Sequence, residues 1–119
     1  MKKKLIRMSL LLATLLISFA SCSKLDIEED QIVGRWQTSK YIYQFNEDYS
    51  GYRTPRDFQE DYPLTWDLNV DELELRITGV GESSIVVYET WVITSISDSR
   101  MEAYDCDDPD ETTVTFNRI

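Results

Sequence analysis

The sequence contains no histidine and only two cysteines in its 119 residues. Without histidine, the chain cannot form a Ser-His-Asp triad, a Cys-His pair or a metal site with imidazole ligands. Basic residues are also few: 12 Lys and Arg stand against 22 Asp and Glu, which gives a formal net charge of -10. Nucleic-acid phosphates require a basic surface, so this charge argues against nucleic acid as a partner. A chain of this length provides one small domain.

The chain also lacks an apolar run long enough to cross a bilayer as a helix. The longest run, residues 8–20, has 13 residues, whereas a membrane-spanning helix needs about 20. It follows a basic segment that contains Lys2, Lys3, Lys4 and Arg7. A basic segment followed by a short apolar run is typical of a secretory signal peptide. We therefore expect residues 1–21 to direct export and then to be removed.

The end of this leader consists of two small residues, Ala20 and Ser21, followed by Cys22. The pattern resembles the lipobox of bacterial lipoproteins, although Phe19 stands where that family most often has Leu. The resemblance implies that the Cys22 thiol receives a diacylglycerol and that acyl chains such as palmitate anchor the protein at the outer membrane or cell surface. Several acyl chains give stable anchoring, because a single chain binds only marginally. The alternative is an ordinary secretory signal followed by an incidental cysteine.

Residues 22–31 are predicted to form a short acidic tether, and residues 32–119 the folded domain. The tether carries Asp26 and the run Glu28-Glu29-Asp30, which would keep the domain away from anionic headgroups. If Cys22 is acylated, Cys106 has no partner within the mature chain. The fold therefore cannot depend on a disulfide.

Alternation of apolar and polar side chains with a period of two dominates the domain. Leu64, Trp66, Leu68 and Val70 share one predicted face, and a turn around Asn69–Asp71 joins this strand to the next one in a hairpin. The segment 84–96 is apolar on both faces, which predicts either a strand buried on both sides or a bulge near Glu89–Thr90. The predicted strands cover residues 33–39, 41–46, 49–54, 63–69, 72–78, 84–95, 100–105 and 112–118.

The connections between these strands are short. Short connections make sequential strands antiparallel neighbours. Such a sheet avoids exposed edges by closing on itself. We therefore predict an all-β fold, a small antiparallel up-and-down β-barrel of about eight strands. A closed barrel and a flattened sandwich are both compatible with the sequence.

Several short motifs follow one another in order along the domain. Gly34-Arg35-Trp36 precedes the first strand, and further motifs occupy residues 45–51, 65–68, 73–77, 91–96 and 115–118. Their order resembles that of the lipocalin-like domains of short bacterial lipoproteins, in which a G-x-W motif opens the barrel. The resemblance implies that Trp36 closes the base of the barrel and that Arg118 packs across it. The mature chain is markedly shorter than a typical lipocalin.

Aromatic side chains are frequent at positions predicted to face the interior. An eight-stranded barrel has room for its own side chains or for one small ligand. If it forms a pocket for a small hydrophobic or amphipathic molecule, we expect Tyr41, Tyr43, Trp66 and Trp91 to line it and Phe58 to stand at its rim. The alternative is a non-enzymatic structural or protein-interaction lipoprotein with a filled core, which works through its acidic surface or an edge strand.

The predicted rim, residues 53–61, contains Arg53 and Arg56 in an otherwise acidic domain. These arginines either meet an anionic ligand or balance nearby carboxylates, and we favour charge balance.

Catalytic and metal-binding motifs have little support in the sequence. The acidic turn at residues 105–111 lacks the order and the glycine of a calcium-binding EF-hand. Cys106 lies among carboxylates, which raise the pKa of a thiol and argue against a nucleophile. We predict no catalytic residue, no metal and no cofactor, and we expect a monomer that contacts the membrane through its lipid anchor.

Overall fold

The computed structural model describes residues 26–80 and 85–119. The predicted signal peptide and Cys22 lie outside the described residues. Within the described part of the chain, no helix is both long and apolar enough to cross a membrane.

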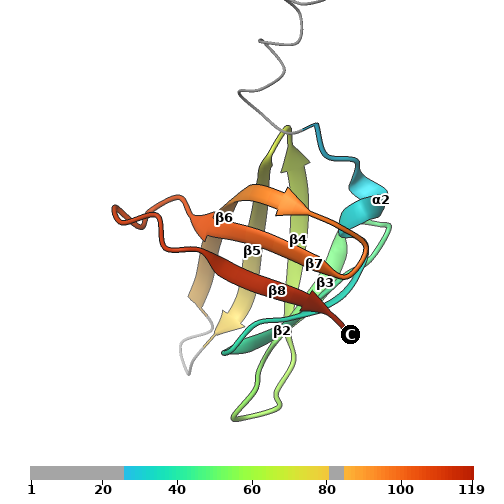
Figure 1. Ribbon diagram of the computed structural model, residues 1–119. Helices are drawn as coiled ribbons and strands as arrows, with labels where there is room; N and C mark the ends of the chain where they lie inside the picture. Colours follow the sequence, from blue (N-terminus) through green and yellow to red (C-terminus); the bar gives the residue numbers. More distant parts are fainter. Residues whose placement is uncertain (1–25, 81–84) are drawn as a thin grey trace, which may run out of the picture.

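Eight antiparallel strands and one helical turn make up the domain (Figure 1). The helical turn, α2, comes first and spans Glu29–Ile32. The strands are β1 (Gly34–Gln37), β2 (Tyr41–Phe45), β3 (Ser50–Pro55), β4 (Tyr62–Asn69), β5 (Glu72–Val80), β6 (Ile85–Ile96), β7 (Arg100–Asp105) and β8 (Val114–Arg118).

The strands form a closed barrel in the order β1 to β8. Each strand pairs with its neighbour in the chain, and β8 returns to pair with β1 through Trp36 opposite Arg118 and Gln37 opposite Asn117. This closure confirms the predicted all-β, up-and-down barrel and excludes the flattened sandwich. Every observed strand begins and ends within two residues of its predicted range.

The hydrophobic core consists of inward-facing residues of every described strand except β3, whose buried residues are Gly51 and Arg53. Along β4, for example, Leu64 and Trp66 are buried while Thr65 and Asp67 are exposed. The described part of the predicted tether also contributes, because Ile27 is buried in the same cluster, together with Ile32, the first residue of the predicted domain. Ile32 belongs to α2, which starts with a hydrogen bond from the Glu28 N–H to the Gln31 side chain. The acidic segment before the barrel therefore packs against it from residue 27 onward.

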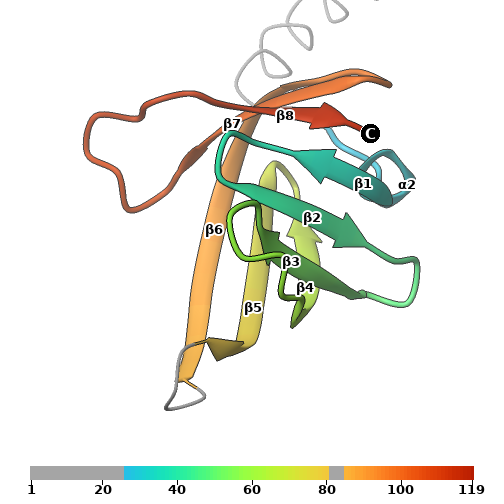
Figure 2. The same ribbon diagram turned by 90° about the horizontal axis from the view of Figure 1, so that it is seen from below.

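Strand β6 differs from its prediction. The sequence predicts burial on both faces or a bulge near Glu89–Thr90, but the register shifts occur at Ile93/Ser95 against β7 and at Ile77/Val80 against β5. In the first half of β6, Ile85, Val86 and Tyr88 are exposed, and Figure 2 shows this half running beside β5 and beyond β7. Its apolar residues are thus not explained by a second buried face.

Val70 departs from the predicted inward face of β4. It lies in the turn between β4 and β5, is half exposed and has a φ of 62°. The left-handed region costs a residue with a side chain about 1–2 kcal/mol, and a branched Cβ makes it worse. The hydrophobic alternation therefore continues one position too far, into a turn that needs a positive φ.

We expect Val70→Gly to raise the free energy of unfolding by about 1 kcal/mol, because glycine adopts this φ without strain. Chemical denaturation would measure the change. Val86→Gly is the matched control, since Val86 is partly exposed in a strand and glycine there should destabilise by about 0.5–1 kcal/mol. Equal losses in the two variants would contradict strain at Val70.

Candidate functional site

A continuous set of aromatic rings occupies the barrel interior. Tyr43 and Phe45 of β2 stack with centroids 5.9 Å apart, and Tyr43 also lies 5.5 Å from Phe116 of β8. Phe116 meets Trp91 of β6 edge to face at 5.1 Å, and Phe45 meets Trp66 of β4 in the same way at 5.8 Å. All five side chains are buried. The rings therefore contact one another across the barrel, from strands on opposite sides.

The residues predicted to bind a ligand fall into two groups. Tyr43, Trp66 and Trp91 belong to this buried set, and Tyr41 packs at its edge, with its ring 5.9 Å from that of Tyr43. Phe58 lies in the connection between β3 and β4 and is 78 % exposed. The structure thus brings Tyr41 and Tyr43 together with Trp91 and Trp66, and it leaves Phe58 outside the barrel.

An ion pair that the sequence did not predict lies inside the barrel. Arg53 of β3 binds Glu89 of β6, with Nη1 2.8 Å from Oε2, and their side chains are only 7 % and 15 % exposed. Arg53 is therefore an inward-facing strand residue, so it does not belong to the predicted rim and does not balance the carboxylates of residues 57–61. The one signal in the sequence is that Glu89 has the same parity as Trp91 on β6.

Aromatic groups complete the environment of this ion pair. Glu89 Oε1 accepts hydrogen bonds from the Tyr43 hydroxyl at 2.9 Å and from the Trp91 indole N–H at 3.1 Å. The Arg53 guanidinium lies over the Tyr41 ring, 4.1 Å from its centroid. Burial first, and then the Glu89 carboxylate, raise the pKa of Tyr43 well above its usual value, so the phenol stays protonated as a donor.

Nearly all the buried polar atoms of this cluster have hydrogen-bond partners. Both Glu89 oxygens are engaged by donors, so the carboxylate is not free to act as a general base. One buried polar atom, Nε of Arg53, has no hydrogen-bond partner among the described residues. Buried polar groups are usually paired, so this N–H is the one group in the cluster that could still donate a hydrogen bond to a ligand oxygen.

Trp36 and Arg118 meet at one end of the barrel. The Arg118 guanidinium lies 4.2 Å from the centroid of the Trp36 ring. Its nitrogens donate to three backbone carbonyls: Asp98 at 2.5 Å, and Val33 and Gln31 at 2.8 Å each. These contacts join the last strand to the segment that precedes the first one.

The glycine of the G-x-W motif has a physical reason here. Gly34 has a φ of 137°, and a Cβ on it would collide with Nη1 of Arg118. Only glycine combines that backbone conformation with room for the guanidinium.

The outer surface carries shallow depressions. One, of about 500 Å³, lies outside β1–β3 and is lined by Arg35, Gln37, Ile42, Thr54, Pro55, Arg56, Gln59 and Asp61. A second, of about 400 Å³, shares Gln37 and Arg56 with it. Neither is lined by Tyr41, Tyr43, Trp66 or Trp91. Arg56 therefore faces the outside of the wall, and its Nη1 donates to the Thr38 carbonyl at 3.2 Å.

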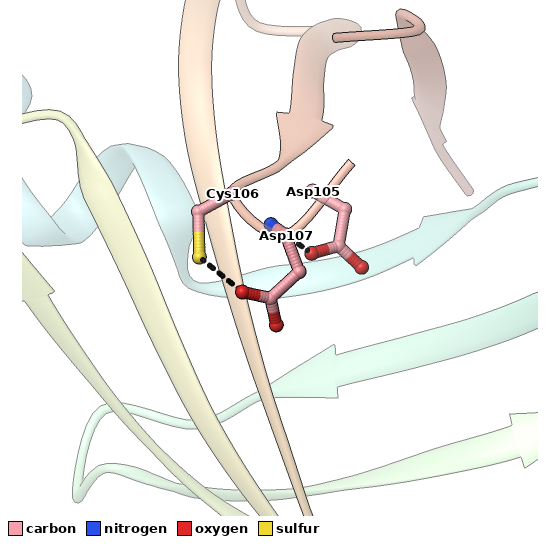
Figure 3. Close-up of side chains that lie close together, drawn as sticks. All are labelled: Asp105, Cys106 and Asp107. Atoms are coloured by element: carbon pink, nitrogen blue, oxygen red, sulfur yellow. Dashed lines mark hydrogen bonds between the residues drawn. The ribbon is translucent and has the colours of Figure 1, made fainter. Parts of the chain in front are cut away.

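The acidic turn after β7 brings three ligand-type side chains together. Figure 3 shows Asp105, Cys106 and Asp107, whose ligand atoms lie within 4.8 Å of one another. Desolvation, with the Asp107 carboxylate adding to it, raises the pKa of the Cys106 thiol. A metal would need the thiolate, so this shift works against coordination. The Asp105 carboxylate accepts the Asp107 N–H at 2.9 Å, an arrangement typical of a turn.

Scans against protein-family models and searches of curated proteins and of solved structures found no match to this chain. What is established is therefore its closed barrel. The roles of individual residues follow from the contacts described above.

Proposed function

We propose that the protein is a lipid-anchored, non-enzymatic lipoprotein of the lipocalin-like kind, whose filled barrel acts through its outer surface. The observation that carries this proposal is the interior itself. Tyr43, Phe45 and Phe116 are among the largest fully buried side chains, and their rings touch those of Trp66 and Trp91. These are the side chains that would otherwise form the walls of a ligand pocket, and an eight-stranded barrel has little room beyond its own side chains.

The outer surface has the features of an interaction surface. Eight large apolar or aromatic side chains are exposed among the described residues. Inside the barrel, the Glu89 carboxylate is saturated with donors and offers no free base. A scaffold or binding role at the membrane surface is consistent with both features.

One observation favours a second candidate, a small amphipathic ligand inside the barrel. The unpaired Nε of Arg53 is buried beside Tyr41 and Tyr43. An anionic head group could reach it if the aromatic residues moved apart. This candidate assigns the ligand contacts to Tyr41, Tyr43 and Trp91.

Native mass spectrometry separates the two candidates. The fragment that begins at Ser23 contains all the described strands and core residues, and it would be purified without detergent. The filled barrel predicts the bare mass of the chain. A reproducible extra mass that organic solvent removes would overturn the first candidate and support the second.

The lipid anchor has its own test. Cys22→Ala removes the thiol that would be acylated, so we expect this variant to leave the membrane fraction and appear in the soluble fraction. Ser23→Ala is the matched control and should stay with the membrane. Membrane association of Cys22→Ala with a cleaved leader would disprove acylation at Cys22.

A further inference from the structure

The barrel wall has an open strand edge at β6. This strand pairs with β5 from Ile85 to Val92, but it pairs with β7 only from Trp91 to Ile96. Among the strands that the structure describes, none pairs with residues 85–89 on the β7 side. Figure 2 shows this half of β6 running beside β5 and beyond β7. An uncovered strand edge is a template for pairing with another strand.

The direction of the backbone groups follows from two hydrogen bonds. The Thr90 carbonyl accepts the Cys106 N–H on the β7 side, whereas the Ile93 N–H donates to Asp71 on the β5 side. Because these directions alternate along a strand, the N–H and C=O groups of Val86 and Tyr88 point to the open edge. This part of the barrel therefore presents donors and acceptors in the spacing of a sheet ladder.

The side chains on this edge are apolar. Ile85, Val86 and Tyr88 are 53 %, 37 % and 70 % exposed. Soluble proteins usually blunt open edges with charges or proline, but the only ionisable side chains at 85–89 are the Tyr88 phenol and Glu89, which binds Arg53 inside the barrel. The edge is thus both unpaired and unprotected.

We propose that this edge pairs with the same edge of a second copy of the chain. A two-fold axis at Val87 places Val86 opposite the partner's Tyr88, and Tyr88 opposite the partner's Val86. All four residues then satisfy their free N–H and C=O groups, and each Val meets a Tyr across the strands, a favourable cross-strand pair. The two surfaces are identical, as a two-fold interface requires. The sequence alone led us to expect a monomer, and the open edge is the reason to revise that expectation.

The acidic character of the chain does not prevent this pairing. The acidic turn after β7 begins beside Thr90, at one end of the edge. In the antiparallel dimer the two Thr90 residues stand at opposite ends, roughly 20 Å apart at about 3.4 Å per residue. That separation exceeds the Debye length of about 8 Å at physiological salt. The edge that the copies share carries no repelling charges.

The pairing is short, so the dimer is weak in dilute solution. Sedimentation equilibrium of the fragment beginning at Ser23, over a wide concentration range, should show a reversible dimer. Val86→Pro removes an edge N–H without touching the β5 ladder, since proline is tolerated where the N–H faces outward. We expect it to weaken dimerisation by about tenfold or more, because the symmetric dimer loses both copies of that hydrogen bond. Val86→Thr is the control, which keeps the N–H and the branched side chain.

Amide hydrogen exchange gives a second readout that does not depend on the proline variant folding. The Val86 and Tyr88 amides should exchange quickly at low protein concentration and become protected as concentration rises. Tyr88→Lys, which places a charge on the edge, should abolish this protection. Both readouts are independent of any bound ligand, so they stand whatever native mass spectrometry finds.

Three outcomes would overturn the proposal. The first is a monomer at every concentration. The second is a dimer that neither Val86→Pro nor Tyr88→Lys weakens, which would place the interface elsewhere. The third is slow exchange of the Val86 and Tyr88 amides in the monomer, which would mean that the chain itself covers this edge.

Discussion

Replacement of Trp36 by alanine is expected to lower the free energy of unfolding by about 3–5 kcal/mol. Trp36 is fully buried, and its indole N–H donates to the Ile32 carbonyl at 2.8 Å. Alanine would leave a cavity and remove the partner of that carbonyl. It would also remove the ring under the Arg118 guanidinium, 4.2 Å from its centroid. A desolvated cation over an indole contributes about 2 kcal/mol to that total.

Chemical denaturation of the soluble fragment measures this loss. Phe58→Ala is the matched aromatic control, because Phe58 is largely exposed and its truncation should change stability by about 0.5 kcal/mol or less. A cost below about 1 kcal/mol for Trp36→Ala would contradict its burial at the base of the barrel.

Glu89→Ala should have an effect of similar size, a loss of about 3–5 kcal/mol, because it leaves a charged partner buried and alone. The Arg53 guanidinium would lose its only carboxylate contact among the described residues. The Tyr43 hydroxyl and the Trp91 indole would lose their acceptor as well. Removal of one partner of a buried pair is costly even where the pair itself adds little to stability.

The double variant Arg53→Met with Glu89→Leu distinguishes the cost of an unpaired buried charge from the cost of a cavity. Apolar side chains of similar volume often replace a buried pair at no net loss, so the double variant should return to within about 1 kcal/mol of the parent protein. Glu74→Ala is the surface control, since Glu74 is exposed on β5, and we expect a change of about 0.5 kcal/mol or less. A double variant as unstable as Glu89→Ala would show that the cavity, and not the unpaired charge, dominates.

The sequence predicted the barrel well because period-two alternation is a local property. Leu64 and Trp66 on β4, and Leu73 and Leu75 on β5, carry that pattern without reference to the rest of the chain. Strand order followed in turn from short connections, which leave few topologies open.

Features that depend on distant pairing were not predictable in the same way. Arg53 and Glu89 lie 36 positions apart. A charged residue next to a turn is predicted to be exposed to solvent unless its distant partner is known. The exposure of Ile85 and Tyr88 depends on where β7 ends, which the composition of β6 does not reveal. The positive φ of Val70 likewise depends on the turn between β4 and β5.

The closure of β1 on β8 has a consequence for how the chain folds. The Arg118 side chain binds the Val33 carbonyl, 85 positions earlier in the sequence. Contacts of such separation slow folding, because most of the chain must be ordered before they form. Closure requires β8, the last of the eight strands in chain order, to pair with β1. A folding intermediate that lacks β8 therefore holds an open sheet, and the barrel is complete only when β8 has paired with β1.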